Sequence, residues 1–258
     1  MAFALDLTDR QALITGAGQG VGRGIALGFA EAGATVAVND LDADRAAGVV
    51  AEIEAASGTA VSAVFDVTDH AAVTAGVEAL GGVDVLVNNA GNAGAEGWPA
   101  MTPFAETQPA DWEAYLQVNL YGVLHCCHAV LPGMIDRAGG RIITIVSDAA
   151  RSGEAQMAVY AAAKAGAAGL MRSLAVEGGR HGVTVNSIAL GTMRTPISEA
   201  FWAEEDNPRA KGLLQKYAIR RPGLPEDVAA LSVFLASDRA SWITGQTYPL
   251  NGGASFAL

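Results

Sequence analysis

The chain has 258 residues, of which 51% are hydrophobic and 17% charged, and its formal net charge is −11. The composition excludes a disordered or low-complexity chain, and the net charge argues against a broad surface for nucleic acid or anionic membranes. A chain of this length is typical of one α/β domain, which we expect to cover residues 1–258.

The sequence shows no membrane span, because no run of 18 apolar residues is free of charges or turn residues. Its first ten residues also lack the basic start and apolar core of a signal peptide. The two cysteines, Cys126 and Cys127, are adjacent and cannot cross-link distant parts of a fold. With only four histidines besides, we expect no metal site. These features favour a reducing compartment, and we expect the cytoplasm.

Short apolar runs alternate with longer helical segments along the chain. Helices are predicted over 20–32, 43–56, 69–80, 109–137, 155–178 and from 225 to about 236. Strands are predicted at 11–15, 35–39, 60–65, 83–88, 141–146, 183–188 and 246–250. This alternation predicts a doubly wound α/β fold, with a parallel sheet and helices on both faces. The one long irregular segment, 191–222, has the length of a functional lid.

A glycine-rich turn, Thr15-Gly-Ala-Gly-Gln-Gly-Val-Gly22, follows the first predicted strand and opens the first helix. Glycines let backbone N–H groups approach a pyrophosphate, and the helix N-terminus adds partial positive charge. Three spaced glycines are a weak signal alone in a chain with 31 glycines, where an ordinary turn is the alternative. Their place between first strand and first helix favours dinucleotide binding.

Asp40 ends the second predicted strand, 18 residues after Gly22. A carboxylate there can accept hydrogen bonds from both hydroxyls of an adenosine ribose and would repel a 2′-phosphate. No Lys or Arg occupies 39–41 or 17–19, so we expect NAD rather than NADP. The alternative is that Asp40 caps the next helix, although Asp42 and Asp44 are better placed for that.

Tyr160 and Lys164 share one face of a predicted helix because they are four residues apart. With five tyrosines and three lysines, chance gives such a pair only about 0.06 times. The alternative is a lysine whose stem covers apolar surface. A cation beside the phenol favours phenolate, so Tyr160 can exchange a proton with a reacting hydroxyl. Ser147, at the end of the preceding strand, can hydrogen-bond the same oxygen or simply cap a helix.

Taken together, these residues resemble the short-chain dehydrogenase/reductase family over essentially the whole chain. The motifs that carry the resemblance are TGAGQGVG at 15–22, NNAG at 88–91, Asn119, Ser147, YAAAK at 160–164 and the NGG after the last strand. The resemblance implies a single Rossmann domain with a seven-stranded parallel sheet. It also implies an NAD(H)-dependent oxidoreductase that acts on a secondary alcohol or ketone, assembled as a homotetramer.

The resemblance implies four catalytic residues. Ser147 would orient the substrate oxygen, Tyr160 would be the general acid/base, and Lys164 would hold the nicotinamide ribose and lower the pKa of the tyrosine. Asn119 would help to hold a water of the proton relay. The implied cofactor-binding residues are Gly16, Gln19, Gly20, Val21, Gly22, Asp40, Asp66, Val67, Asn89, Ala90, Gly91, Tyr160, Lys164, Gly191 and Thr192.

The chain departs from the family after the sixth strand, where Leu190-Gly191 replaces the common Pro-Gly. Proline fixes φ, so this departure predicts a less rigid start of the lid and less certain contacts at Thr192. The string SDAARSGEAQMAVYAAAK at 147–164 is similar to members that oxidise alicyclic hydroxyacyl-CoA esters.

Apolar residues of the lid can close a pocket over an apolar, alicyclic or acyl-CoA substrate. They are Met193, Phe201, Trp202, Leu213, Leu214 and Tyr217, with Trp98, Met101 and Phe104 as the opposite wall. The alternative is that they pack the lid onto the domain or a neighbouring subunit.

Two other functions compete with this interpretation. A nucleotide-sugar epimerase shares Tyr-x-x-x-Lys, but its GxxGxxG spacing is broken here by Gln19. A non-catalytic NAD-binding redox sensor or scaffold would usually lack the tyrosine or the lysine.

Overall fold

The computed structural model describes residues 5–91, 102–203 and 207–256. Its centre is one seven-stranded parallel sheet in the order β3-β2-β1-β4-β5-β6-β7. The strands are β1 (Gln11–Ile14), β2 (Thr35–Asp40), β3 (Thr59–Val64), β4 (Val85–Asn88), β5 (Gly140–Ser147), β6 (Val183–Leu190) and β7 (Thr247–Leu250). The predicted doubly wound fold is therefore confirmed, with strand ends within two residues of those expected.

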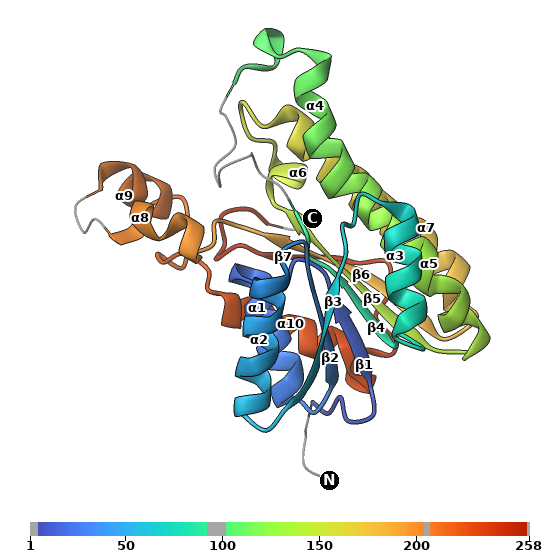
Figure 1. Cartoon of the computed structure of the whole chain (residues 1–258). Coiled ribbons are helices and arrows are strands. Elements are labelled where there is room, and N and C mark those ends of the chain that lie inside the picture. The colour runs from blue at the N-terminus through green and yellow to red at the C-terminus, as the bar shows by residue number, and fades with distance from the viewer. Residues whose placement is uncertain (1–4, 92–101, 204–206, 257–258) are drawn as a thin grey trace.

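Helices cover both faces of the sheet (Figure 1). One face carries α1 (Gly20–Glu31), α2 (Ala43–Ala55) and α10 (Pro225–Ala236), and its core includes Ile25, Phe29 and Val228. The other face carries α3 (His70–Ala79), α5 (Gly122–Asp136) and α7 (Ala158–Gly179). The five central strands are almost entirely buried because both sheet faces are covered there, whereas the edge strand β3 exposes Val61 and Val64.

The strand order reverses beside β1, whose neighbours are β2 on one side and β4 on the other. In open parallel sheets, ligands bind outside the carboxyl ends of the strands at such a reversal. The loops after β1, β2 and β4 all meet at this edge, so the topology alone brings the glycine-rich turn, Asp40 and the NNAG segment together.

The helix predicted over 109–137 differs from expectation in its middle. It consists of α4 (Pro109–Leu116), a π-helical turn (Gln117–Tyr121) and α5. Asn119 lies in the π turn and is fully buried. Single π turns within α-helices are frequent at functional sites, and this one turns an amide inward that a regular helix would place differently.

Two further predictions need correction. The helix expected from 155 begins at Ala158, because Gly153 and Gln156 adopt positive φ, and a separate short helix, α6 (Ala149–Ser152), precedes it. The segment 191–222 is not irregular throughout. It contains a 3₁₀ turn (Pro196–Ser198), α8 (Glu199–Ala203) and α9 (Pro208–Leu214), which start at proline or just after a capping turn.

The helical rod Pro109–Asp136 is long and apolar enough to cross a membrane by length and composition alone. Its apolar window is 39% buried within the protein, and α5 packs on α3, α7 and the sheet. A core helix meets the same two criteria, so the rod is weak evidence for a span.

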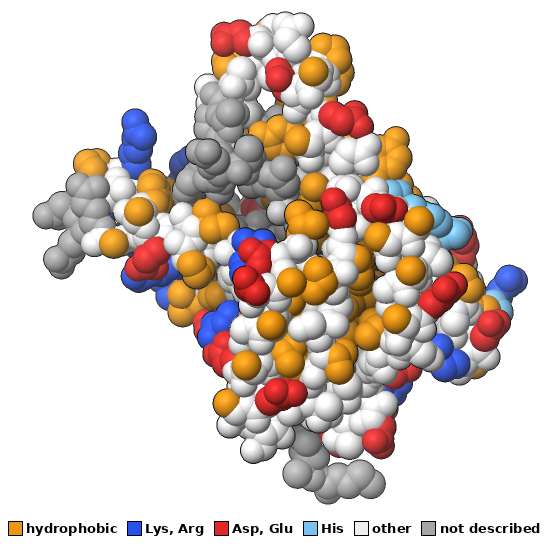
Figure 2. Space-filling model, viewed as in Figure 1, with side chains coloured by type: hydrophobic (Ala, Val, Ile, Leu, Met, Phe, Trp, Pro, Cys, Tyr) orange, Lys and Arg blue, Asp and Glu red, His pale blue; other side chains and the backbone are white. Residues whose placement is uncertain are grey.

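On the face of the molecule shown in Figure 2, basic side chains are scattered among acidic ones, and the whole chain carries a formal net charge of −11.

Candidate active site

A cavity of about 360 Å³ opens at the carboxyl edge of β1, β2 and β4. The structure brings eleven of the predicted cofactor residues together on its wall. They are Gly16, Gln19, Gly20, Val21, Gly22, Asp40, Asp66, Val67, Asn89, Ala90 and Gly91. The wall also includes residues that the sequence did not indicate, namely Asn39, Leu41, Arg45, Phe65, Val118, Thr195, Pro196 and Ile197.

The glycine-rich turn leaves room only for backbone. Gly16 has φ +62, and a Cβ added there would lie 2.8 Å from the Cα of Ala90. A Cβ on Gly22 would lie 2.3 Å from the carbonyl oxygen of Gly16. At the start of α1, Gln19 makes no side-chain cap, so the first N–H groups of this helix face the cavity as anion donors. These residues fit a dinucleotide pyrophosphate.

The NNAG segment is tied directly to the phosphate turn. Asn89 Nδ2 donates to the carbonyls of Thr15 and Gly16 at 2.9 and 3.0 Å. The backbone N–H groups of Asn89 and Ala90 both donate to Thr15 Oγ1 at 3.0 Å. These bonds fix the floor of the cavity before any ligand arrives.

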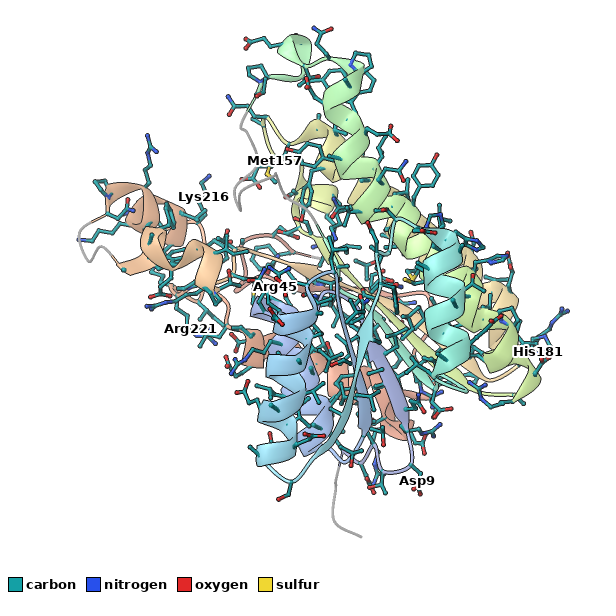
Figure 3. All side chains as sticks on the ribbon, viewed as in Figure 1. Asp9, Arg45, Met157, His181, Lys216 and Arg221 are labelled. Atoms are coloured by element: carbon teal, nitrogen blue, oxygen red, sulfur yellow. The ribbon has the colours of Figure 1, made fainter. Side chains whose placement is uncertain are left out.

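Asp40 does not cap α2. That role belongs to Asp42, whose side chain accepts from the N–H groups of Asp44 and Arg45. Asp40 is buried, and its Oδ2 accepts from the N–H of Gly18 at 3.0 Å. Its Oδ1 accepts from Arg45 Nη2 at 2.8 Å. No Lys or Arg is next to Asp40 in the sequence, but the first turn of α2 brings the guanidinium of Arg45 to this edge of the sheet (Figure 3). This neighbour was not foreseen from the sequence.

Asp66 and Val67 form the far wall of the cavity after β3. Asp66 Oδ1 accepts from the N–H and the hydroxyl of Thr68, both at 2.8 Å. The carbonyl of Val67 lies 3.0 Å from His125 Nδ1 on α5. The turn is thus held by its own side chain and by the helix behind it.

β5 and α7 bring the hydroxyl of Ser147 close enough to Tyr160 to influence the pKa of the phenol. The N–H of Ala149 donates to Ser147 Oγ at 3.2 Å, which fixes this side chain at the strand end. Burial of the hydroxyl raises the pKa of Tyr160, the nearby hydroxyl of Ser147 lowers it, and the charge of Glu154 raises it further. The phenol therefore keeps its proton at neutral pH in the protein alone.

Lys164 lies one helical turn from Tyr160, with Nζ 5.9 Å from the tyrosine ring centre. Its Nζ donates to the carbonyl of Ile145 at 2.9 Å, and burial lowers its pKa to about 8. Asn119 anchors itself by donating from Nδ2 to the carbonyl of Tyr115 at 3.0 Å. Its Oδ1 and Lys164 Nζ both face Gly91, since a Cβ there would lie 3.2 and 3.3 Å from them.

Gly191 and Thr192 are not on the wall of the nucleotide cavity. They line a second cavity of about 130 Å³ beneath the lid, together with Tyr217 and Asn251. The lid reaches the nucleotide cavity three residues later, at Thr195. A Cβ on Gly20 would lie 3.6 Å from Thr195 Cγ2, so this part of the lid faces the phosphate turn.

The expected apolar substrate walls are only partly present. Trp98 and Met101 lie outside the described residues. Phe104 stacks on Trp112 with ring centres 5.6 Å apart and is exposed. On the lid, Phe201 and Trp202 form an edge-to-face pair and are partly buried, as are Met193, Leu213 and Leu214, whereas Tyr217 is buried.

Comparison with known proteins identifies the family. The model of a family described as "Enoyl-(Acyl carrier protein) reductase", a set of short-chain dehydrogenases/reductases, matches residues 16–255. The chain is 39% identical to (2S)-[(R)-hydroxy(phenyl)methyl]succinyl-CoA dehydrogenase subunit BbsD of Thauera aromatica, over 97% of this chain and 98% of that one. It is 38% identical to 7alpha-hydroxysteroid dehydrogenase of Escherichia coli, over 96% and 95%. The chain belongs to the short-chain dehydrogenase/reductase family.

Solved structures agree with this assignment. A 7alpha-hydroxysteroid dehydrogenase complexed with NADH and 7-oxo glycochenodeoxycholic acid has a TM-score of 0.86 and 37% identity, covering 96% of this chain and 95% of that one. A gluconate 5-dehydrogenase from Burkholderia cenocepacia in complex with NADP and tartrate has a TM-score of 0.89 and 32% identity, covering 98% of each. The protein is an oxidoreductase whose relatives differ in nicotinamide cofactor and in substrate.

In this short-chain dehydrogenase/reductase, the end of β6 is held without proline. Leu190 pairs with Ser147 of β5 and Leu250 of β7. Its carbonyl accepts from the N–H of Asp148, and the N–H of Gly191 donates to Leu250, at 2.9 and 3.1 Å. The sheet ladder therefore continues to the first residue of the lid.

A polar cluster joins the end of β5, where Ser147 lies, to the last described residues. Asp148, next to Ser147, accepts from Arg151 at 2.7 Å, Ser255 at 2.8 Å and Asn251 Nδ2 at 3.0 Å. The described residues contain no group of three or more metal-ligating side chains placed to hold a metal. Burial raises the pKa of both thiols, that of Cys127 to about 12, so both thiols keep their protons at neutral pH.

Proposed function

We propose that this protein is an NAD(H)-dependent dehydrogenase or reductase that transfers hydride between nicotinamide and a secondary alcohol or ketone, with Tyr160 as general acid/base. The observation that carries the proposal is the grouping of the Tyr160 and Ser147 hydroxyls, with Lys164 one helical turn away and facing Gly91 of the nucleotide cavity. A pair of hydroxyls can hold a carbonyl oxygen and supply a proton to it.

Each catalytic residue has a distinct task. Ser147 donates to the substrate oxygen and orients it. In the reductive direction Tyr160 gives its proton to that oxygen, and in the oxidative direction it takes the proton back. Lys164 binds the ribose hydroxyls, and its positive charge favours the phenolate needed for oxidation. Asn119, which faces Gly91 beside Lys164, holds a water that returns the proton to solvent.

The dinucleotide is held by residues from five loops, those after β1, β2, β3, β4 and β6. Bound nicotinamide supplies or accepts the hydride. The α1 N-terminus takes the pyrophosphate, Asp40 takes the adenosine ribose, and Asp66-Val67 flank the adenine. Although Gly191 and Thr192 line the second cavity rather than the nucleotide cavity, we infer that this start of the lid meets the carboxamide. Since the Asp40 carboxylate repels a 2′-phosphate, we infer that NAD is preferred, with Arg45 close enough to temper that preference.

Some of the relatives and the aromatic residues of the lid support the substrate class that we propose. Hydroxysteroid and aromatic acyl-CoA dehydrogenases are among the similar proteins, and partly buried aromatic residues lie on the lid. We therefore propose an apolar or alicyclic alcohol or ketone, with hydroxyacyl-CoA esters as one class. Activity confined to sugars or small polyols would contradict this.

We also propose that residues 1–258 form one catalytic domain with a lid near 191–222, working in the cytoplasm as a homotetramer. Val176 on α7 and Tyr121 on the rod are large apolar side chains that face solvent, 81% and 46% exposed. A second subunit against α5 and α7 would cover such surface. A monomer by light scattering at micromolar concentration would contradict the assembly.

The experiment that tests the function is a substrate panel with NAD⁺ and NADP⁺, read by the appearance of reduced nicotinamide. It includes alicyclic alcohols, sterols, hydroxyacyl-CoA esters and polyols, and uses Tyr160→Phe as the matched control. We expect turnover with NAD⁺ on one class, lost by a factor of about 10² to 10⁴ in the variant. Tight NADH binding with no turnover on any class would favour a redox sensor or scaffold instead.

A further inference from the structure

The backbone and side-chain polar groups of Thr192, two residues beyond β6, are hydrogen-bonded by later residues of the chain. Its N–H donates to the hydroxyl oxygen of Tyr217 at 2.8 Å, and its carbonyl accepts from the N–H of Gly223 at 3.0 Å. Its Oγ1 accepts from the same Tyr217 hydroxyl at 3.0 Å. One tyrosine oxygen thus accepts one bond from Thr192 and donates another to it.

The Tyr217 side chain is built into the protein rather than lying loosely on it. It is only 7% exposed, although it belongs to the lid segment that follows α9. Its ring packs against Gly252, where a Cβ would lie 2.9 Å from Tyr217 Cδ1. Its hydroxyl lies 3.1 Å from the Cβ position of Gly191. Two glycines therefore make the space through which the hydroxyl reaches Thr192.

Thr192 lies between two parts of the proposed site. The preceding Leu190 pairs with the catalytic Ser147, and Thr195, three residues later, lines the nucleotide cavity opposite Gly20. The stretch from Leu190 to Thr195 therefore runs from the reacting end of the site toward the phosphate turn. The nicotinamide half of a dinucleotide must lie between these two places.

We propose that Tyr217 is a positioning residue for the nicotinamide end of the cofactor and acts through Thr192. Because Tyr217 donates to Oγ1, the threonine hydroxyl keeps its own proton to donate, and an amide carbonyl such as that of the carboxamide is the acceptor it suits. The proposal rests on the proposed function. It also explains how the lid keeps its start in place although Leu190 replaces the family's proline.

The test separates the two halves of the cofactor. Affinities for NADH and for ADP-ribose, which lacks the nicotinamide, are measured by calorimetry for wild type, Tyr217→Phe, Thr192→Val and the double variant. Tyr248→Phe, a partly buried tyrosine on β7, is the matched control. If wild type prefers NADPH, the pair becomes NADPH and 2′-phospho-ADP-ribose.

We expect Tyr217→Phe to weaken NADH binding about tenfold, as the loss of one or two hydrogen bonds predicts, with ADP-ribose within twofold of wild type. The double variant should bind NADH no more weakly than Thr192→Val, because both substitutions disrupt the same Tyr217–Thr192 contact. Tyr248→Phe should match wild type.

Three results would overturn the proposal. Equal losses of NADH and ADP-ribose affinity would make Tyr217 a purely structural residue. Unchanged NADH affinity in Tyr217→Phe, or additive losses in the double variant, would deny that it acts through Thr192. If Tyr217→Phe does not fold, Thr192→Val decides alone. Unchanged NADH affinity in Thr192→Val would show that the threonine hydroxyl donates no hydrogen bond to the cofactor. A wild-type protein that binds neither NADH nor NADPH refutes the proposed function instead.

Discussion

Lys164 Nζ donates to the backbone carbonyl of Ile145 at 2.9 Å, in a place where the lysine side chain is almost completely buried. Burial lowers the pKa of this ammonium from 10.5 to about 8. Burial therefore removes the ammonium from water, and the hydrogen bond to one carbonyl compensates only partly for the lost hydration. A group arranged this way is costly to the fold and useful to a reaction.

Replacing Lys164 by methionine should abolish turnover and stabilise the protein at neutral pH. Between pH 8 and 10.5 the unfolded lysine binds more protons than the folded one, so wild-type stability rises with pH across that window. The destabilisation by the buried ammonium is fully present below pH 8 and amounts to about 3 kcal/mol. The gain in stability of the methionine variant is smaller by about 1 kcal/mol, because the hydrogen bond to Ile145 is lost. Urea unfolding of both proteins at pH 7 and pH 10 checks this. A stability difference that does not shrink at pH 10 would contradict it.

Arg45 and Asp40 should set the cofactor preference together. Asp40→Asn removes the charge that repels a 2′-phosphate and releases the guanidinium that lies 2.8 Å from it. We expect kcat/KM with NADP⁺ to rise about tenfold, the size of one charge-assisted hydrogen bond. Adding Arg45→Met should cancel that gain.

The control for this prediction is Arg23→Met, an α1 arginine paired with Glu52. It should leave the NADP⁺ gain of Asp40→Asn unchanged. An equal gain with and without Arg45 would show that the guanidinium takes no part in cofactor choice.

Glu154→Gln should move the pH profile of alcohol oxidation. The negative charge of Glu154 raises the pKa of Tyr160, so its removal lowers that pKa and lets the phenolate form at lower pH. The acid limb of kcat against pH should shift to lower pH, most clearly at low ionic strength because Glu154 is exposed. Asp136→Asn, at the far end of α5, should leave the profile in place. A shift to higher pH for Glu154→Gln would reverse the assignment.

Asn251→Asp should destabilise the protein strongly. Asn251 Nδ2 donates to Asp148 Oδ2 at 3.0 Å in a buried cluster. A second carboxylate there removes the donor and adds like-charge repulsion, so we expect a loss of about 3 kcal/mol at pH 7. Ser255→Ala removes the hydrogen bonds of Ser255 Oγ with Asp148, Arg151 and Asn251 but adds no charge, and it should cost only about 1 kcal/mol because Asp148 and Asn251 keep their bond to each other. Chemical unfolding of the two variants measures the difference, and similar losses would show that charge at this cluster is unimportant.

The fold could be predicted because its signals are local. Apolar strands buried on both faces are continuous in sequence, and glycine-rich turns mark where they end, so the alternation of strands and helices and the parallel sheet follow. The boundaries of α7 could not be predicted, because positive φ at Gly153 and at Gln156, a residue type that seldom adopts it, shortens a segment whose composition is helical.

The site could be predicted only where its residues have a fixed spacing. Tyr160 and Lys164 share a helix face, and the phosphate turn has a set place after β1. Arg45 was missed because it lies five residues beyond Asp40, although Asp42 as N-cap was a signal that the first turn of α2 would return to the strand end. Asn119 depends on a π turn that has no sequence signature. The contact of Tyr217 with Thr192 spans 25 residues of lid.

The replacement of a proline by Leu190 has a thermal consequence. A pyrrolidine ring restricts the backbone equally at every temperature. The start of this lid is instead held by hydrogen bonds of Gly191 and Thr192 with Tyr217, Gly223 and Leu250, and such bonds loosen as the protein is heated. The beginning of the lid should therefore lose order while the sheet is still intact. Cofactor affinity, rather than unfolding, would then set the upper limit of the temperature range in which this enzyme works.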